Sequence, residues 1–215
     1  MIAENPAIEL GKIEVKLKEI VPFTDDEIAR ILAAAKAEVP KIYALVLLMR
    51  YSGLRISDAT MLSVDKLNGD RLSLRTRKVS KDVSVLLPKV VVDALRAIKP
   101  TSPTHFFWNG TSTLHSVTDL YRDHYLRRVF KGAKLEGQPH PHQLRHTFAA
   151  SLLSAGTSVE NVATLLGNTP RVVWKHYAAW VKSRQDALDE AVLKASGYHR
   201  LLPASPQRRA RRRAS

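Results

Sequence analysis

The sequence predicts an α+β fold that is predominantly α-helical and carries a small three-stranded antiparallel sheet. Apolar residues recur with the helical period through most of the chain. Between Leu67 and Leu87 the period changes to two, as in Arg71-Leu72-Ser73-Leu74-Arg75, and this alternation predicts strands. The chain has 215 residues, of which 45% are hydrophobic, so it can bury one core and one main domain is expected.

Helix start and stop signals divide the rest of the chain. Thr24 and Glu27 form a capping-box pattern, which predicts a helix start. Pro40 opens a second helix, and Gly53 allows a turn that places Arg55 near the start of a new helix. Further helices are expected at 88–98, 117–131, 142–155, 158–167, 170–179 and 182–195.

Composition along the chain predicts three segments. Residues 1–21 are charged and mixed, and we expect an N-terminal arm or linker there. Residues 22–200 carry the helix and strand patterns and form the expected main domain. Residues 201–215 have no apolar face to bury, so a disordered basic tail is expected, which either solubilises the chain or contacts phosphates.

The charge and the residue types narrow the class of partner. The formal net charge is +14, and removing the five arginines of the tail leaves +9, so the main domain is itself basic. A soluble basic protein most often binds nucleic acid. The chain has no cysteine, which excludes disulfides, a thiolate nucleophile and cysteine-ligated metal. It has no membrane-length apolar stretch and no secretion signal, so we expect a cytoplasmic protein without a membrane partner.

Separate blocks of the sequence carry residues suited to phosphate chemistry. Arg55 follows Gly53-Leu54, and a second block reads His142-Gln143-Leu144-Arg145-His146. A third reads Leu165-Leu166-Gly167-Asn168, and Tyr177 lies nine residues after its end. In this order the blocks resemble those of the tyrosine recombinases, the phage integrase family, over about residues 22–180.

The resemblance implies a helical catalytic domain of the DNA breaking-rejoining type, acting without metal or cofactor. Tyr177 would attack a DNA phosphate, forming a 3′-phosphotyrosyl link and a free 5′-hydroxyl. Lys78, at the tip of the predicted hairpin, would protonate the leaving oxygen, with Lys81 as the alternative. Double-stranded DNA is the implied partner, with a homotetramer on two duplexes. An apolar stripe within 181–193 would dock on a neighbouring subunit or pack against its own core.

The side-chain chemistry agrees with these roles. Arg55 and Arg145 suit a phosphate clamp, because a guanidinium group donates two parallel hydrogen bonds and stays charged. His142 lies three residues before Arg145 on the same helix face. The resemblance implies that it contacts the phosphate and assists proton transfer from the tyrosine, and a histidine accepts a proton near neutrality. Asp58 is expected to orient Arg55 or to pair with it. Five cations are expected to bind DNA: Arg77, Lys81, Arg122, Arg127 and Arg128.

Asn168 departs from the family pattern, which has histidine or tryptophan at this position. An amide can donate a hydrogen bond to a phosphate but cannot carry a proton at neutral pH, and asparagine also commonly ends helices. His146 is expected to be packed or hydrogen-bonded within the core. His140 and His176 receive no role.

Two other functions remain open. A DNA-binding module that has lost catalysis would regulate an active recombinase, and a type IB topoisomerase would use the same tyrosine chemistry. Members of the family usually carry a separate N-terminal helical domain, whereas this sequence begins almost at the catalytic domain. We therefore expect either a fragment of a longer integrase or a naturally short relative.

Overall fold

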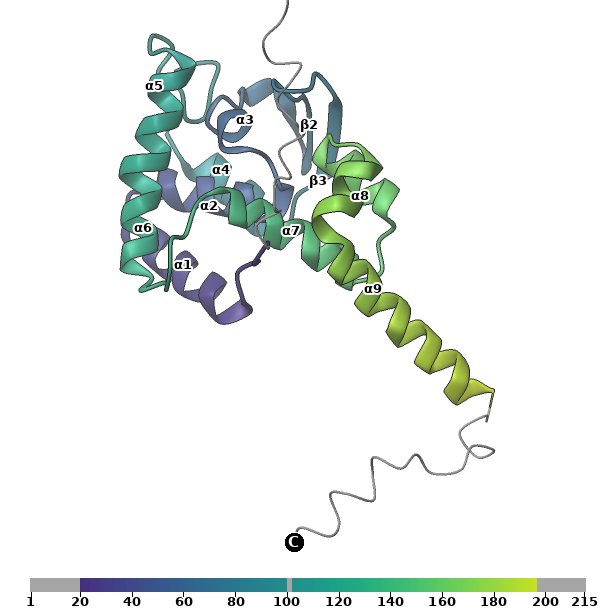
Figure 1. Ribbon diagram of the computed structural model, residues 1–215. Coiled ribbons are helices and arrows are strands. Elements are labelled where there is room, and N and C mark those ends of the chain that lie inside the picture. The colour runs from purple at the N-terminus through teal and green to yellow at the C-terminus, as the bar shows by residue number, and fades with distance from the viewer. Residues whose placement is uncertain (1–19, 100–101, 197–215) are drawn as a thin grey trace, which may run out of the picture.

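In the computed structural model, helices surround a small sheet and a long last helix extends away from the body (Figure 1). The structure describes residues 20–99 and 102–196, so the expected tail and almost all of the expected N-terminal arm lie outside it. The helices are α1 (Asp25–Ala37), α2 (Pro40–Ser52), α3 (Ile56–Thr60), α4 (Lys89–Ala97), α5 (Leu114–Asp119), α6 (Arg127–Gly132), α7 (His142–Ser154), α8 (Val159–Leu166) and α9 (Pro170–Ala195). The strands are β1 (Leu67–Asn68), β2 (Arg71–Arg75) and β3 (Asp82–Leu86), with a 3-10 turn η1 (Val64–Lys66) before them and a π-helical segment η2 (Leu120–Leu126) after α5. The predicted fold class is confirmed.

Helix α1 begins where the capping-box pattern predicts. The side-chain hydroxyl oxygen of Thr24 accepts a hydrogen bond from the backbone N–H of Glu27 at 3.2 Å, and Glu27 Oε2 accepts one from the backbone N–H of Thr24 at 2.8 Å. Both donors lie in the first turn, where the helix itself offers no acceptor. The buried face of α1, formed by Ile28, Ile31 and Ala35, then packs into the core.

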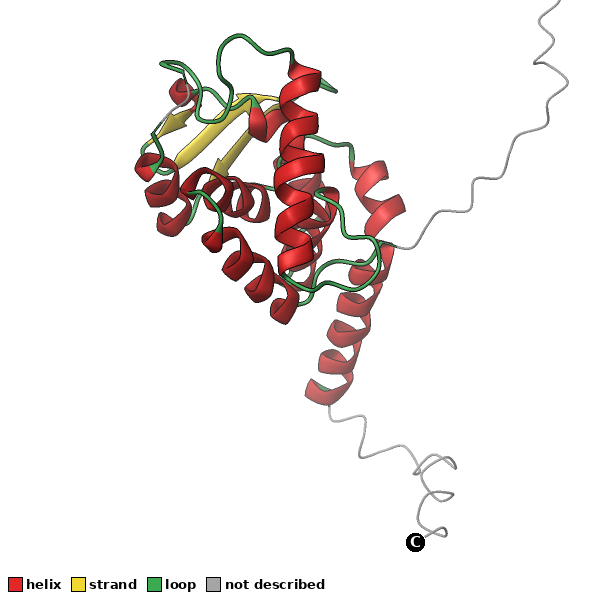
Figure 2. Cartoon of the chain, turned by 90° about the vertical axis from the view of Figure 1, so that its left-hand side faces the viewer, coloured by secondary structure: helices red, strands yellow, loops and turns green. Residues whose placement is uncertain are grey.

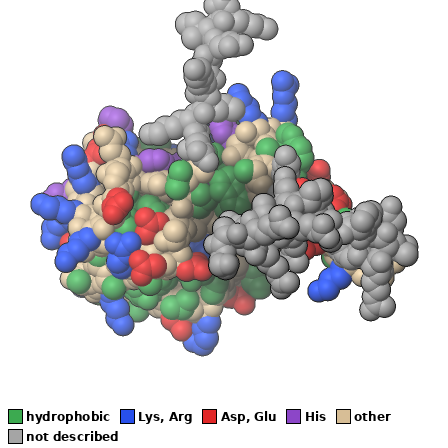
Figure 3. Space-filling view, turned by 60° about the horizontal axis from the view of Figure 1, so that its bottom comes forward, with side chains coloured by type: hydrophobic (Ala, Val, Ile, Leu, Met, Phe, Trp, Pro, Cys, Tyr) green, Lys and Arg blue, Asp and Glu red, His purple; other side chains and the backbone are tan. Residues whose placement is uncertain are grey.

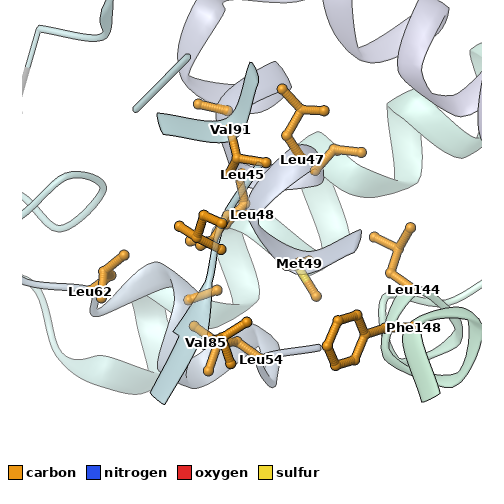
Figure 4. Close-up of a cluster of buried hydrophobic side chains, with 14 of the residues drawn as sticks. Leu45, Leu47, Leu48, Met49, Leu54, Leu62, Val85, Val91, Leu144 and Phe148 are labelled. Carbon is orange, nitrogen blue, oxygen red and sulfur yellow. The ribbon is translucent and has the colours of Figure 1, made fainter. Parts of the chain in front are cut away.

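Helix α2 is the central element of the core and contacts α1, α4 and α7. Its residues from Ala44 to Met49 are all buried, so this helix is apolar on every side, as expected of a helix enclosed by others. Figure 4 shows Phe148 of α7 directed toward the segment that carries Leu54, just beyond the end of α2. The core therefore extends to the turn that precedes Arg55.

The three strands form an antiparallel sheet in the order β1-β2-β3. Leu72 of β2 is paired with Val85 of β3 and both are buried, whereas their neighbours along the strands are mostly exposed. This is the alternation on which the strand prediction depended. The backbone N–H of Thr76 donates to the carbonyl oxygen of Lys81 at 2.8 Å and closes the hairpin tip, which carries Lys78.

The helix expected at 117–131 is longer than predicted and is not α-helical throughout. It begins at Leu114, and its middle section η2 winds as a π-helix before α6 continues to Gly132. Figure 2 shows α5, η2 and α6 as one rod across the body. Tyr121 in η2 is buried, and its hydroxyl donates to the carbonyl oxygen of Phe107 at 3.1 Å.

Helix α9 replaces the two helices expected at 170–179 and 182–195. The sequence between 171 and 195 has neither glycine nor proline, so nothing local stops the helix near residue 180. The departure from helical geometry lies earlier, at Tyr177, with φ −128° and ψ 18°. The first half of α9 packs against α7 and α8, while the second half leaves the body (Figure 1).

Candidate active site

The six residues predicted to act on a phosphate line one cavity of about 780 Å³. They come from five separate parts of the fold: the turn before α3, the β2–β3 hairpin, α7, the end of α8 and α9. They are Arg55, Lys78, His142, Arg145, Asn168 and Tyr177. The fold thus brings together blocks that lie up to 122 residues apart in the sequence.

Arg55 is held at the start of α3 and half-buried. Its Nη2 donates a hydrogen bond to Oδ1 of Asn168 at 2.9 Å. Its Nη1 is buried and meets no hydrogen-bond acceptor among the described residues. A buried guanidinium nitrogen without an acceptor is costly, so this donor suits an anion that enters the cavity.

Two glycines allow the turns that carry Arg55 and Asn168. Gly53 ends α2 with φ +64°, and a Cβ there would lie 2.4 Å from Cδ1 of Phe148. Gly167 ends α8 with φ +60°, and its Cβ would lie 2.9 Å from Cγ2 of Val83. Both positions therefore require glycine for the backbone conformation and for the close approach of a neighbouring side chain.

Arg145 lies deeper than a surface phosphate clamp, with 2% of its surface exposed. Its Nη1 donates to the carbonyl oxygen of Gly53 at 2.7 Å, and its Nη2 donates to that of Leu166 at 2.7 Å. It thereby joins the turn after α2 to the end of α8. Burial, together with the positive charge of Arg55, lowers the pKa of Arg145 to about 10, so the group stays cationic at neutral pH. Further N–H groups of the guanidinium remain for a ligand.

Tyr177 and His146 meet beside these arginines. The Tyr177 hydroxyl lies 2.7 Å from Nδ1 of His146, and Tyr177 is only 3% exposed. Burial raises the pKa of Tyr177 to about 12, an effect that the charge of Arg145 partly opposes. Burial and the neighbouring His142 lower the pKa of His146 to about 3, so this imidazole is neutral at pH 7.

The expectation that His146 is hydrogen-bonded was correct, but its partner is the predicted nucleophile. No spacing rule links two residues 31 positions apart on different helices, so sequence reasoning did not assign this histidine to the site. His142 packs edge-on against His146, with ring centroids 4.7 Å apart. Surrounding protein, together with Arg145 and Arg55, lowers the pKa of His142 to about 4.

The hairpin lysines differ in position. Lys78 lines the cavity, whereas the Nζ of Lys81 donates to the backbone carbonyl oxygen of Asn168 at 2.9 Å. Oδ1 of the buried Asp58 accepts a hydrogen bond from the backbone N–H of Arg77 at 3.0 Å. Asp58 thus fixes the base of the hairpin turn, and no ion pair between Asp58 and Arg55 is formed among the described residues.

The other cations expected to bind DNA lie outside this cavity. Arg122 pairs with Asp119 at 2.6 Å and with Asp123 at 2.8 Å, and Arg128 pairs with Glu38 at 3.1 Å. Arg122 and Arg127 line a second hollow of about 700 Å³. On the face in Figure 3, acidic side chains lie among the lysine and arginine side chains, with hydrophobic and other surface between them. The role of these cations therefore stays a prediction.

Within the part of the chain that the structure describes, no three histidine, aspartate or glutamate side chains gather as metal ligands would. The described helices include none with the length and apolarity to cross a bilayer.

The fold and the tyrosine-centred site define a class, that of tyrosine recombinase catalytic domains. A sequence profile described as the phage integrase family matches residues 22–184, and the chain belongs to that family. The resemblance noted from the sequence is confirmed.

Relatives and solved structures that are similar to the chain carry related names. A tyrosine recombinase of Thermosipho africanus (strain TCF52B) is 32% identical over 174 residues, which cover 79% of this chain and 60% of that protein. Tyrosine recombinase XerA of Thermococcus kodakarensis is 28% identical, over 68% of this chain and 54% of that protein. The catalytic domain of bacteriophage HP1 integrase superposes with a TM-score of 0.62 at 20% identity, over 80% of this chain and 95% of that domain. The chain thus spans a little over half the length of these two relatives.

Proposed function

We propose that this chain is the catalytic domain of a site-specific recombinase that cleaves and rejoins DNA through a 3′-phosphotyrosyl intermediate. One observation carries the proposal: Tyr177 lines the same cavity as Arg55, whose buried Nη1 has no hydrogen-bond acceptor among the described residues. A nucleophile beside an unsatisfied cation suits an anionic electrophile such as a phosphodiester. The fold neighbours include a Tn1549 transposon integrase in complex with a circular intermediate DNA, which supports DNA as the substrate. We therefore also propose that the protein is associated with DNA, in the cytoplasm.

Each step of the proposed reaction has a side chain in the cavity. The Tyr177 hydroxyl gives its proton to a histidine of the cavity as its oxygen attacks phosphorus, the O–P bond forms, and the bond from phosphorus to the 5′-oxygen breaks. Arg55 and Arg145 stabilise the charge on the phosphorane. Lys78 gives a proton to the leaving 5′-oxygen, and His142 contacts the phosphate. Because the phosphotyrosyl link keeps the energy of the broken bond, the 5′-hydroxyl of another strand can attack it without ATP.

Asn168 supports Arg55 in this proposal instead of acting on a proton. Its Oδ1 accepts the hydrogen bond from Arg55, which leaves the amide N–H groups to face a phosphate. The Nζ of Lys81 donates to the backbone carbonyl oxygen of Asn168 and helps to hold the same loop. The departure from the family pattern is therefore compatible with cleavage.

We also propose a homotetramer on two DNA duplexes, formed through the second half of α9. Leu188, Val192 and Leu193 are 46%, 66% and 43% exposed on a helix that leaves its own body. An apolar stripe of this kind is suited to a groove on another subunit. The alternative in which the stripe packs on its own core is disfavoured, because these side chains stay exposed in the single chain.

The test is incubation with nicked duplexes that trap cleavage products, followed by a denaturing gel. The wild-type chain is expected to form a covalent adduct with DNA, and Tyr177→Phe is expected to form none. Salt-sensitive binding without any adduct would favour the DNA-binding module. Relaxation of supercoiled DNA without sequence preference would favour a topoisomerase.

A further inference from the structure

The Tyr177 hydroxyl has one close partner among the titratable groups of the cavity. The distance of 2.7 Å to Nδ1 of His146 is that of a well-formed hydrogen bond. The Tyr177 ring lies between the rings of His146 and Trp180, with centroid distances of 5.7 Å and 5.9 Å. The backbone of α9 departs from helical geometry at Tyr177, the residue that makes these contacts. The hydrogen bond to His146 holds the hydroxyl toward α7 before any DNA is bound.

We propose that His146 is a catalytic residue that orients the Tyr177 hydroxyl and accepts its proton during attack on DNA. The inference rests on the proposed function and deepens it. The hydroxyl donates to the lone pair of Nδ1, so the resting imidazole carries its proton on Nε2. As the bond from the Tyr177 oxygen to phosphorus forms, the phenolic proton moves to Nδ1 and the imidazole becomes imidazolium. Rejoining returns the proton to the tyrosine.

The two histidines of α7 face different parts of the site. His142 is influenced by Arg55 and Lys78, which are the cations expected to hold the phosphate and the leaving oxygen. Arg145 and His140 influence both histidines, His142 and His176 also influence His146, and the Nδ1 of His146 lies 2.7 Å from the Tyr177 hydroxyl. In the proposed mechanism the two histidines have different roles: His142 contacts the phosphate, and His146 accepts the proton of Tyr177.

The surrounding charges explain why the proton transfer from Tyr177 to His146 requires bound DNA. Burial and the neighbouring cationic groups make an imidazolium at His146 unfavourable in the empty cavity. A phosphodiester brings a negative charge to the same cavity, and an opposite charge within a few ångströms favours the charged imidazole. Proton transfer from Tyr177 is therefore coupled to substrate binding.

The first test needs no activity. Nitrogen-15 NMR of the histidine rings in the DNA-free chain reports which nitrogen carries the proton. We expect His146 in the wild type to be neutral, protonated on Nε2, with the Nδ1 signal shifted by an accepted hydrogen bond, and we expect Tyr177→Phe to remove that shift. A wild-type His146 protonated on Nδ1 would overturn the proposal, because that nitrogen could not accept the phenolic proton.

The second test measures single-turnover adduct formation on the nicked duplex. His146→Ala is expected to slow it by about 10²-fold or more, the usual contribution of a general base. His146→Asn keeps a hydrogen-bond acceptor near Nδ1 but cannot take a proton, so it should remain nearly as slow. Added imidazole should restore rate to His146→Ala but not to His142→Ala. The matched control is His124→Ala, which removes an exposed imidazole that does not line this cavity.

The outcomes separate the two proposals. If the wild-type chain forms the adduct and His146→Ala or His146→Asn forms it equally fast, the proposed role of His146 is overturned. The proposed function is then still supported. Absence of an adduct from the wild type would instead count against the proposed function, and the NMR result would still decide the hydrogen bond. Thermal unfolding and DNA affinity of each variant distinguish a lost proton acceptor from a lost fold.

Discussion

Arg55 and Asn168, 113 positions apart, are joined by a hydrogen bond of 2.9 Å from Nη2 to Oδ1. The bond occupies Nη2 of Arg55, whereas Nη1 has no hydrogen-bond acceptor among the described residues and suits a ligand. It explains how an asparagine can occupy a position at which the family has histidine or tryptophan. In the proposed function the residue orients a cation, and a proton carrier is not needed for that.

Substitution of Asn168 is expected to act through Arg55. Asn168→Ala removes the acceptor, and we predict adduct formation roughly 10- to 100-fold slower, because a hydrogen bond to a charged group contributes roughly 1.5–3 kcal/mol. Asn168→Asp should be slower still, since a carboxylate pairs with Arg55 and competes with the phosphate. Rates are measured on the nicked duplex at fixed salt. Equal rates for both variants and the wild type would contradict this role.

Gly53→Ala is expected to destabilise the fold by about 1–3 kcal/mol, from overpacking alone. The added Cβ would lie 2.4 Å from Phe148, and the backbone there has φ +64°. Gly69→Ala is the matched control, because Gly69 has φ +63° but no neighbour within 4 Å. Urea unfolding of both variants separates steric overlap from backbone conformation. A similar loss in the two variants would show that the contact with Phe148 contributes little.

The chain is expected to lose stability on acidification because of His146. Its pKa is about 3 in the folded chain, against an ordinary value of 6.5 that applies when the chain unfolds. Between these values the unfolded chain binds the proton and the folded chain does not. The free energy of unfolding therefore falls as the pH drops below about 6.5, and the contribution is fully present above it. Urea titrations at several pH values should show a shallower decline in His146→Asn.

The two hairpin lysines are expected to differ in chemistry. Lys78→Ala should slow cleavage strongly on ordinary DNA and much less on DNA with sulfur at the 5′-bridging position, because a thiolate leaves without a proton. Lys81→Ala loses its bond to the carbonyl oxygen of Asn168, so any decrease should be the same on both substrates. Sulfur rescue of Lys81→Ala in place of Lys78→Ala would reverse the assignment.

Arg127 is expected to contribute more to DNA binding than Arg128. Arg128 already pairs with Glu38, whereas Arg127 lines the second hollow. Arg127→Ala should reduce the slope of log affinity against log salt by about one, as loss of one phosphate contact does. Arg128→Ala should leave the slope nearly unchanged. Fluorescence anisotropy with a labelled duplex at several salt concentrations measures both.

The parts of this protein that depend on local signals were predictable. The capping box at Thr24, the alternation in β2 and β3 and the glycine at the end of α2 each act over a few residues. The ordered blocks around Arg55, Arg145 and Tyr177 were sufficient to indicate the family. Helix α9 was predicted less well, because its kink at Tyr177 has no glycine or proline to mark it.

By itself, the sequence determined the fold class, the family and six of the residues that line the cavity, because these follow from short-range patterns and residue types. Only the tertiary structure decided which partner each residue has. Arg145 binds the carbonyl oxygens of Gly53 and Leu166, and His146 meets the Tyr177 hydroxyl, through the packing of α7 against α2, α8 and α9. Such contacts depend on helices that lie far apart in the chain, and no local spacing encodes them.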